Sequence, residues 1–129
     1  MNDDSTIVFV CEHGAAKSVL AAAHFNRLAA QARLSLHAVA RGTNPDRELS
    51  AEVIHGLLED GLSPAEAAPQ QLTEVDLQTA QRVIAFCDLP TEAHRKAVIE
   101  RWDDVPPVSE NYEKARDAIL ERIRQLLNQ

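Results

Sequence analysis

Apolar residues along the chain alternate between short continuous runs and stretches with helical spacing. The run at residues 6–10 is β-branched and aromatic, and its near-continuous hydrophobicity is typical of a strand buried on both faces of a parallel sheet. The runs at residues 36–40 and 82–87 predict two further strands, and residues 97–99 predict a short edge strand.

Helical periodicity separates these runs. Residues 18–32, 49–59 and 109–127 place apolar side chains three or four positions apart, which predicts three helices with one buried face. Thr73 followed by Asp76 resembles a capping pair for a short helix that continues to residue 80.

The helix predicted at residues 49–59 carries the clearest end signals. Ser50 is suited to cap its N-terminus, and Gly61 is well placed to end it. Val53, Leu57 and Leu58 are expected to face the core.

The alternation of strands and helices predicts a single α/β domain over residues 1–129. Strands that alternate with helices form a doubly wound sheet, so we expect a three-layer α/β/α sandwich with about four parallel strands. The length of 129 residues is too small to divide into two domains that each bury a useful core.

Composition and charge limit the classes of partner that the protein can bind. An apolar fraction of 45% and a charged fraction of 26% are ordinary for a globular protein. The net charge of −7 makes nucleic acid and anionic membranes poor partners. The acidic start of the chain does not resemble a secretory signal, so we expect the protein in the cytoplasm.

The cysteines and histidines predict no metal centre and no cofactor. Cys11 and Cys87 are too few for a disulfide scaffold, and no Cys or His pair has the spacing of zinc ligands. The four histidines outside the loop after the first strand are interpreted as surface or half-buried residues. They are His24, His37, His55 and His94.

The loop after the first strand carries the candidate chemistry. A thiol at the end of a strand, one turn before a helix, lies in the positive field of that helix, which favours the thiolate. Gly14 supplies a positive φ, and small neighbours let backbone amides converge on an anion. Cys11 is the candidate nucleophile, Lys17 a cation at the rim and Ser18 a hydrogen-bond donor to the thiolate. The candidate oxyanion-binding residues are Glu12, His13, Gly14, Ala15, Ala16, Lys17 and Ser18.

This loop resembles the active-site loop of low-molecular-weight protein tyrosine phosphatases and thioredoxin-coupled arsenate reductases. The family pattern is Cys, five residues, Arg, and Ser or Thr, so Lys17 stands where the family has Arg. Later segments of the chain resemble the same family, so nearly the whole chain is covered. They are residues 40–43, residues 71–73 with 83–88, and residues 102–107 with 112 and 116–117. The resemblance implies the family's small α/β fold and hydrolysis of a phosphate monoester through Cys11.

The resemblance also implies a general acid before the last helix. The family carries an Asp directly before a Pro, whereas this chain has Pro106-Pro107 at the matching position. Asp104 is the first candidate for the acid and Asp103 the second. The alternative interpretation of both is a solvated turn.

The second cysteine, Cys87, supports a second candidate activity, the reduction of arsenate. A cysteine at this position in the arsenate reductases attacks the adduct between nucleophile and arsenic, and Cys87 is therefore a candidate redox partner of Cys11. The alternative is that Cys87 only packs in the core. A third hypothesis is an oxyanion-binding or regulatory module with little turnover. The implied partners are phosphate or arsenate, a phosphoprotein and a thiol reductant; the sequence leaves the oligomeric state open.

Overall fold

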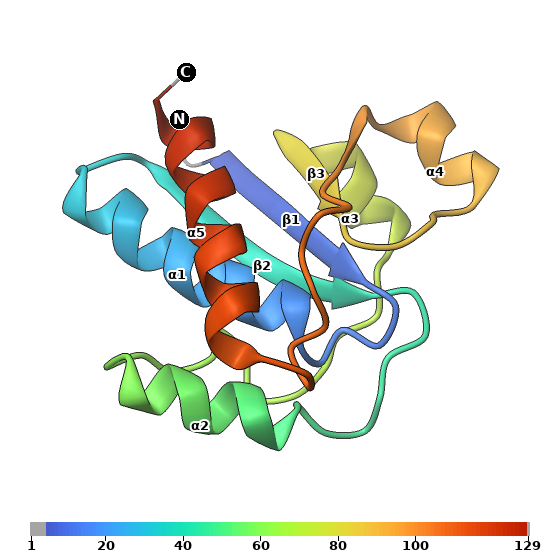
Figure 1. Cartoon of the computed structure of the whole chain (residues 1–129). Helices are drawn as coiled ribbons and strands as arrows, with labels where there is room; N and C mark the ends of the chain where they lie inside the picture. The colour runs from blue at the N-terminus through green and yellow to red at the C-terminus, as the bar shows by residue number, and fades with distance from the viewer. Residues whose placement is uncertain (1–4, 129) are drawn as a thin grey trace.

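Four parallel strands form one sheet in the order β2-β1-β3-β4 (Figure 1). The computed structural model describes residues 5–128. The strands are β1 (Ser5–Cys11), β2 (Leu36–Gly42), β3 (Arg82–Ala85) and β4 (Ile99–Arg101). The two long strands β1 and β2 pair along their whole length, and the register ends with Cys11 opposite Gly42.

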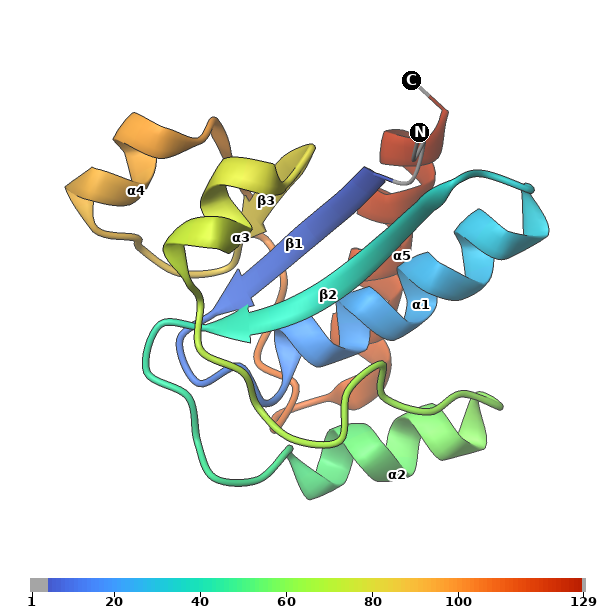
Figure 2. The same ribbon diagram turned by 180° about the vertical axis from the view of Figure 1, so that it is seen from behind.

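Helices cover both faces of this sheet. On one face lie α1 (Lys17–Gln31), α2 (Ala51–Glu59) and α5 (Tyr112–Leu127). The other face carries α3 (Glu74–Thr79) and α4 (Thr91–Lys96), as the view from behind shows (Figure 2). The prediction of a three-layer α/β/α sandwich with four parallel strands is confirmed. No helix of the described chain is long and apolar enough to cross a membrane.

Aromatic rings fill the core under α1 and α5. The Phe9 ring lies 6.0 Å from that of Phe25 and 5.6 Å from that of Trp102, measured between ring centroids. All three side chains are fully or almost fully buried. The Trp102 indole N–H donates to a Glu100 carboxylate oxygen at 2.9 Å, so its one polar atom is satisfied.

Capping residues confirm several predicted helix ends. The Ser50 hydroxyl accepts from the Val53 amide at the start of α2, and Gly61 takes a φ of +79° just beyond its end. Thr73 and Asp76 form a reciprocal capping box at the start of α3.

Other sequence predictions are corrected by the structure. The third strand stops at Ala85, and the edge strand lies at residues 99–101 rather than 97–99. The helix α4 was not expected, because six residues with Ala93 as their one buried side chain show no periodicity. The last helix begins at Tyr112, where the Asn111 side chain caps it. Leu58 is 70% exposed, so the prediction that it faces the core is wrong.

The interpretation of His24 as a surface or half-buried residue is also wrong, because its side chain in α1 is only 1% exposed. Its Nε2 lies 3.5 Å from Asp60 Oδ2, and neither ring nitrogen makes a hydrogen bond within residues 5–128. Asp60 itself accepts from the Tyr112 hydroxyl at 2.9 Å and from Arg116 at 3.0 Å. Burial lowers the pKa of His24, with Arg27 and Arg116 acting in the same direction and Asp60 opposing them.

We therefore predict that His24 makes the fold less stable in mild acid. The unfolded chain takes up a proton near the ordinary His pKa of 6.5, and the folded chain does so only at lower pH. The free energy of unfolding should fall as the pH drops below that value. The His24→Gln variant should lose less of that free energy between about pH 8 and pH 5 than the wild type, in urea unfolding followed by circular dichroism.

The matched control for this experiment is the exposed His37, changed to Gln. His37→Gln should keep the wild-type dependence on pH. Equal pH dependence in His24→Gln and the wild type would contradict the prediction.

Candidate active site

The candidate site lies where β1 ends and α1 begins. Because the strands are parallel, the ends of β2 and β3 meet the end of β1 at the same edge of the sheet. Cys11 is the last residue of β1, and Lys17 is the first residue of α1. Residues 12–16 form the loop between them. This arrangement places the predicted thiol at the position where open α/β sheets bind ligands.

Backbone hydrogen bonds orient this loop. Four carbonyl oxygens of residues 11–15 accept from amides of residues 43–50, the segment that follows β2. The pairs are Thr43 to Cys11 at 3.3 Å, Asn44 to Glu12 at 2.8 Å, Asp46 to His13 at 3.0 Å and Ser50 to Ala15 at 2.9 Å. In a planar trans peptide the N–H points opposite to the C=O. The amides of residues 12, 13, 14 and 16 therefore face away from the 43–50 segment, toward the inside of the loop.

A backbone contact between two glycines makes this orientation possible. Gly14 has a φ of +61°, as predicted from the sequence. A Cβ on Gly42 would lie 2.7 Å from the Gly14 nitrogen, and a Cβ on Gly14 would lie 2.9 Å from the Gly42 nitrogen. Any side chain at either position would push the loop away from the end of β2.

The thiol of Cys11 lies at the base of the loop. Its Sγ is 3.0 Å from the Ser18 hydroxyl oxygen, and both residues are buried. Ala16 at the N-cap of α1 offers no side-chain acceptor to the first amides of the helix. These amides and the helix dipole therefore favour a negative charge at this end of α1.

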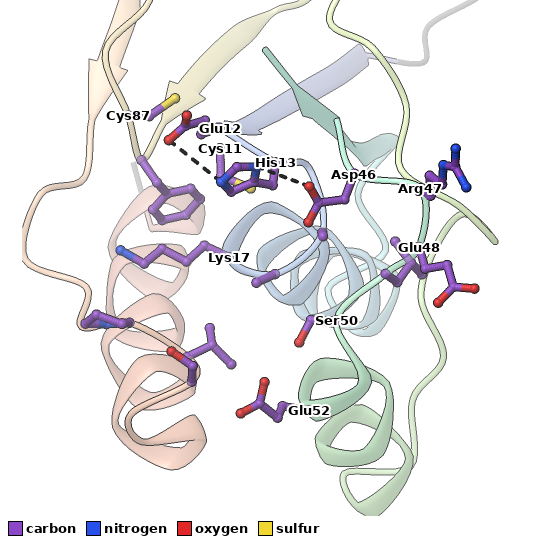
Figure 3. Close-up of a pocket in the computed structure, with 17 residues that line it drawn as sticks. Cys11, Glu12, His13, Lys17, Asp46, Arg47, Glu48, Ser50, Glu52 and Cys87 are labelled. Carbon is purple, nitrogen blue, oxygen red and sulfur yellow. Dashed lines mark ion pairs between the residues drawn. The ribbon is translucent and has the colours of Figure 1, made fainter. Parts of the chain in front are cut away.

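Lys17 contacts a different segment of the chain. Its Nζ donates to the Val105 carbonyl oxygen at 2.9 Å, across 88 positions of sequence. The ammonium thus lies at the side of the pocket next to residues 105–109, rather than against the thiol (Figure 3).

A cavity of about 710 Å³ opens above the loop. Cys11, Lys17 and Cys87 all line it (Figure 3). Phe86 and Val108 contribute apolar wall. Burial, together with the neighbouring Cys11, raises the pKa of the Cys87 thiol. Within residues 5–128, no three His, Cys, Asp or Glu side chains are grouped so as to hold a metal ion.

The two candidate acids do not reach this cavity. Asp104 accepts from Arg122 of α5 at 2.9 Å, and Asp103 accepts from Arg101 at 2.6 Å. Neither aspartate lines the cavity that contains Cys11. The hydrogen bond from Arg122 lowers the pKa of the Asp104 carboxyl, so a smaller fraction of this group carries a proton that it could donate. The structure therefore does not bring the predicted Asp104 together with the thiol.

Sequence reasoning missed the opposite wall of the cavity. Asp46, Glu48 and Glu52 line it, from the turn after β2 and the start of α2. The available signal was topological, since the turn after a second parallel strand lies at the same edge as the loop after the first. Nothing in the residue types of this turn indicated a role.

Comparison with known proteins identifies the fold and the loop. A sequence model described as low-molecular-weight phosphotyrosine protein phosphatase matches residues 6–129. The chain belongs to this family. No curated protein sequence matches it significantly.

Solved structures agree with this assignment. An arsenate reductase from Archaeoglobus fulgidus is 27% identical, with a TM-score of 0.79 over 95% of this chain and 99% of the other. A low-molecular-weight protein tyrosine phosphatase from T. tengcongensis is 21% identical, with a TM-score of 0.83 over 97% and 99%. A thioredoxin-dependent arsenate reductase from Corynebacterium glutamicum is 22% identical, with a TM-score of 0.75 over 97% and 61%.

Two features around this loop differ from those that the resemblance to the family implies. Cys11, Gly14 and Ser18 all lie on the segment that runs from the end of β1 into the first turn of α1. Lys17 binds a backbone carbonyl oxygen, and no aspartate of residues 103–104 enters the cavity. The differences from the family pattern therefore concern Lys17 and the expected acid. The backbone amides of the loop keep their inward orientation.

We predict that Gly42→Ala disrupts this cradle of inward backbone amides. The new methyl group would overlap backbone atoms of Gly14 and His13, which cannot move aside as a side chain can. Phosphate affinity should fall at least about tenfold, equivalent to about 1.4 kcal/mol. Isothermal titration of the protein with phosphate measures this change.

Gly61→Ala is the matched control. Gly61 also has a positive φ, but the nearest atom to a new Cβ there is 3.9 Å away, far from the thiol loop. This variant should lose about 1–2 kcal/mol of stability through strain and keep its phosphate affinity. Equal affinity in Gly42→Ala and the wild type would show that the glycine contact does not shape the cradle.

Proposed function

We propose that the protein is a thiol-dependent phosphatase that hydrolyses phosphate monoesters through Cys11. The supporting observation is the combination of a buried thiol, 3.0 Å from a serine hydroxyl, with loop amides that face the same interior. A nucleophile at the base of an anion cradle is suited to attack phosphorus.

In this mechanism the Cys11 thiolate attacks phosphorus and the ester oxygen leaves. The S–P bond forms as the P–O bond to the leaving group breaks, and water then cleaves the thiophosphate to release phosphate. Inward amides stabilise the three equatorial oxygens, and Ser18 stabilises the thiolate. Lys17 provides a single charge where an arginine would provide a bidentate fork, a difference of about 2–4 kcal/mol by analogy with an oxyanion-hole donor.

The partners follow from the same chemistry. The loop is proposed to bind phosphate or arsenate, with a phosphoprotein as a candidate source of the phosphoryl group. We also propose a cytoplasmic location and one domain over residues 1–129. The family match favours an enzyme over an oxyanion-binding module without turnover.

The first test is hydrolysis of 4-nitrophenyl phosphate. Cys11→Ser should lower turnover by more than about 10³-fold, because a hydroxyl is not ionised at neutral pH. Ser18→Ala should slow turnover less, since it removes one hydrogen bond to the thiolate and keeps the nucleophile. The release of nitrophenolate measures both.

Alkylation supplies an independent control. In a Cys87→Ser background, Cys11 is the one cysteine of the chain, and phosphate should protect it from iodoacetamide. Turnover that persists in Cys11→Ser would contradict this mechanism. Alkylation of Cys11 by iodoacetamide at an unchanged rate in the presence of phosphate would contradict it as well. Phosphate binding without turnover in any variant would instead indicate the binding module.

Arsenate reduction is the second candidate activity, because Cys11 and Cys87 line one cavity. Cys11 would displace water from arsenate to form an S–As(V) bond. The Cys87 thiolate would then attack the Cys11 sulfur, so that the disulfide forms, two electrons pass to arsenic and arsenite leaves. An external dithiol such as thioredoxin would reduce the disulfide.

We predict that this activity depends on a disulfide between Cys11 and Cys87. Arsenate with limiting dithiol should yield this disulfide in the wild type, detected as a crosslinked peptide by mass spectrometry. Because burial raises the pKa of Cys87, its formation should accelerate as pH rises above neutrality. Arsenite production that continues unchanged in Cys87→Ser would assign the reduction to an external thiol.

A further inference from the structure

The cavity around Cys11 lacks the aspartate that was expected to protonate the leaving group. Asp103 and Asp104 are bound by Arg101 and Arg122, outside the cavity. Cleavage of an ester with a poor leaving group still requires a proton on the departing oxygen. If Cys11 acts as proposed above, on which this inference rests, another group of the cavity must carry that proton.

A histidine and an aspartate face each other at the mouth of the cavity. His13 Nδ1 lies 3.2 Å from Asp46 Oδ1, and the Asp46 amide donates to the His13 carbonyl oxygen at 3.0 Å. The two residues are thus joined through both side chains and backbone. Figure 3 shows the His13 ring between Asp46 and Glu12.

The second ring nitrogen faces Glu12 but makes no hydrogen bond within residues 5–128. His13 Nε2 is 3.9 Å from the nearer Glu12 oxygen, which is beyond hydrogen-bond distance. The side chain is 54% exposed, so the ring meets the solvent side of the cavity, where a leaving group must lie. The ring is therefore positioned by Asp46 at Nδ1, and Nε2 can donate to a leaving group whenever it carries a proton.

Other groups of the cavity are less suited to this task. Lys17 donates to the Val105 carbonyl oxygen, and burial keeps the Cys87 thiol a weak acid. A carboxyl group in general loses its proton well below neutral pH. Imidazole is the side chain that ordinarily exchanges a proton near neutral pH.

We propose that His13 is the general acid of this site and that Asp46 is its positioning residue. As the Cys11 sulfur bonds to phosphorus and the P–O bond breaks, the proton on His13 Nε2 moves to the departing oxygen. The neutral imidazole then takes a proton from the water that hydrolyses the thiophosphate. Phosphate leaves, and the thiolate and the imidazolium are both restored.

The test compares two phosphate esters that differ in their need for a proton. Nitrophenolate leaves as an anion, whereas the more basic phenolate needs protonation. His13→Gln should lower kcat/KM for phenyl phosphate by about 10²-fold or more and affect 4-nitrophenyl phosphate far less. Asp46→Asn should give the same selective loss at a smaller size, because the imidazole stays and only its orientation suffers.

His37→Gln, at an exposed histidine on β2, is the matched control and should change neither ester. An equal loss on both esters in His13→Gln would indicate a structural role and overturn the proposal, as would no loss on either. A wild type that hydrolyses neither ester, with Cys11 unprotected by phosphate, would overturn the proposed function itself and this inference with it. Turnover abolished by Cys11→Ser but insensitive to His13→Gln would overturn this inference alone.

Discussion

The backbone contact between Gly14 and Gly42 is the constraint on which the rest of the site depends. Cys11 pairs with Gly42 at the end of the sheet, so the loop after β1 must pass directly against the turn after β2. With no Cβ at either glycine, amides of residues 43–50 reach the loop carbonyls. Those carbonyls point outward, and the remaining amides consequently converge above the thiol. The inward orientation of these amides is thus a product of the sheet register and of two glycines that lack a Cβ.

Most of the fold was predictable because its strands and long helices carry strong, local patterns. The run before Cys11 and the periodicity of α1 and α5 depend on residues close in sequence, and so do the caps at Ser50 and Thr73. The failures occur where tertiary context decides. The six residues of α4 are too few to show a helical pattern of apolar positions. Leu58 fits the apolar spacing of its helix, but its side chain is exposed in the folded protein. His24 is buried because α1 packs between the sheet and α5.

The residues of the candidate site also fall into those that the sequence predicts and those that it does not. The loop from Cys11 to Ser18 is contiguous in sequence, so its thiol, its positive-φ glycine and its serine were all visible there. The wall at Asp46 and Glu52 comes from a segment that shares only an edge of the sheet with the loop. The position of Asp104 depends on Arg122, 18 residues away on another element. Contacts between residues so far apart in sequence follow from tertiary packing rather than from residue type.

The charge of the cavity explains why backbone groups matter so much here. Four acidic residues, Glu12, Asp46, Glu48 and Glu52, line it, against the two cations Lys17 and Arg47. An oxyanion entering such a cavity gains little from net charge, and Lys17 already donates to a carbonyl oxygen. Peptide dipoles carry no net charge, and their orientation is fixed before the ligand arrives, so they attract an anion without reorganisation. The same carboxylate rim places the His13 ring between two acids, with Nδ1 3.2 Å from Asp46 Oδ1 and Nε2 3.9 Å from Glu12 Oε1. In this arrangement the carboxylates that disfavour free anions also position the imidazole ring that we propose as the proton donor.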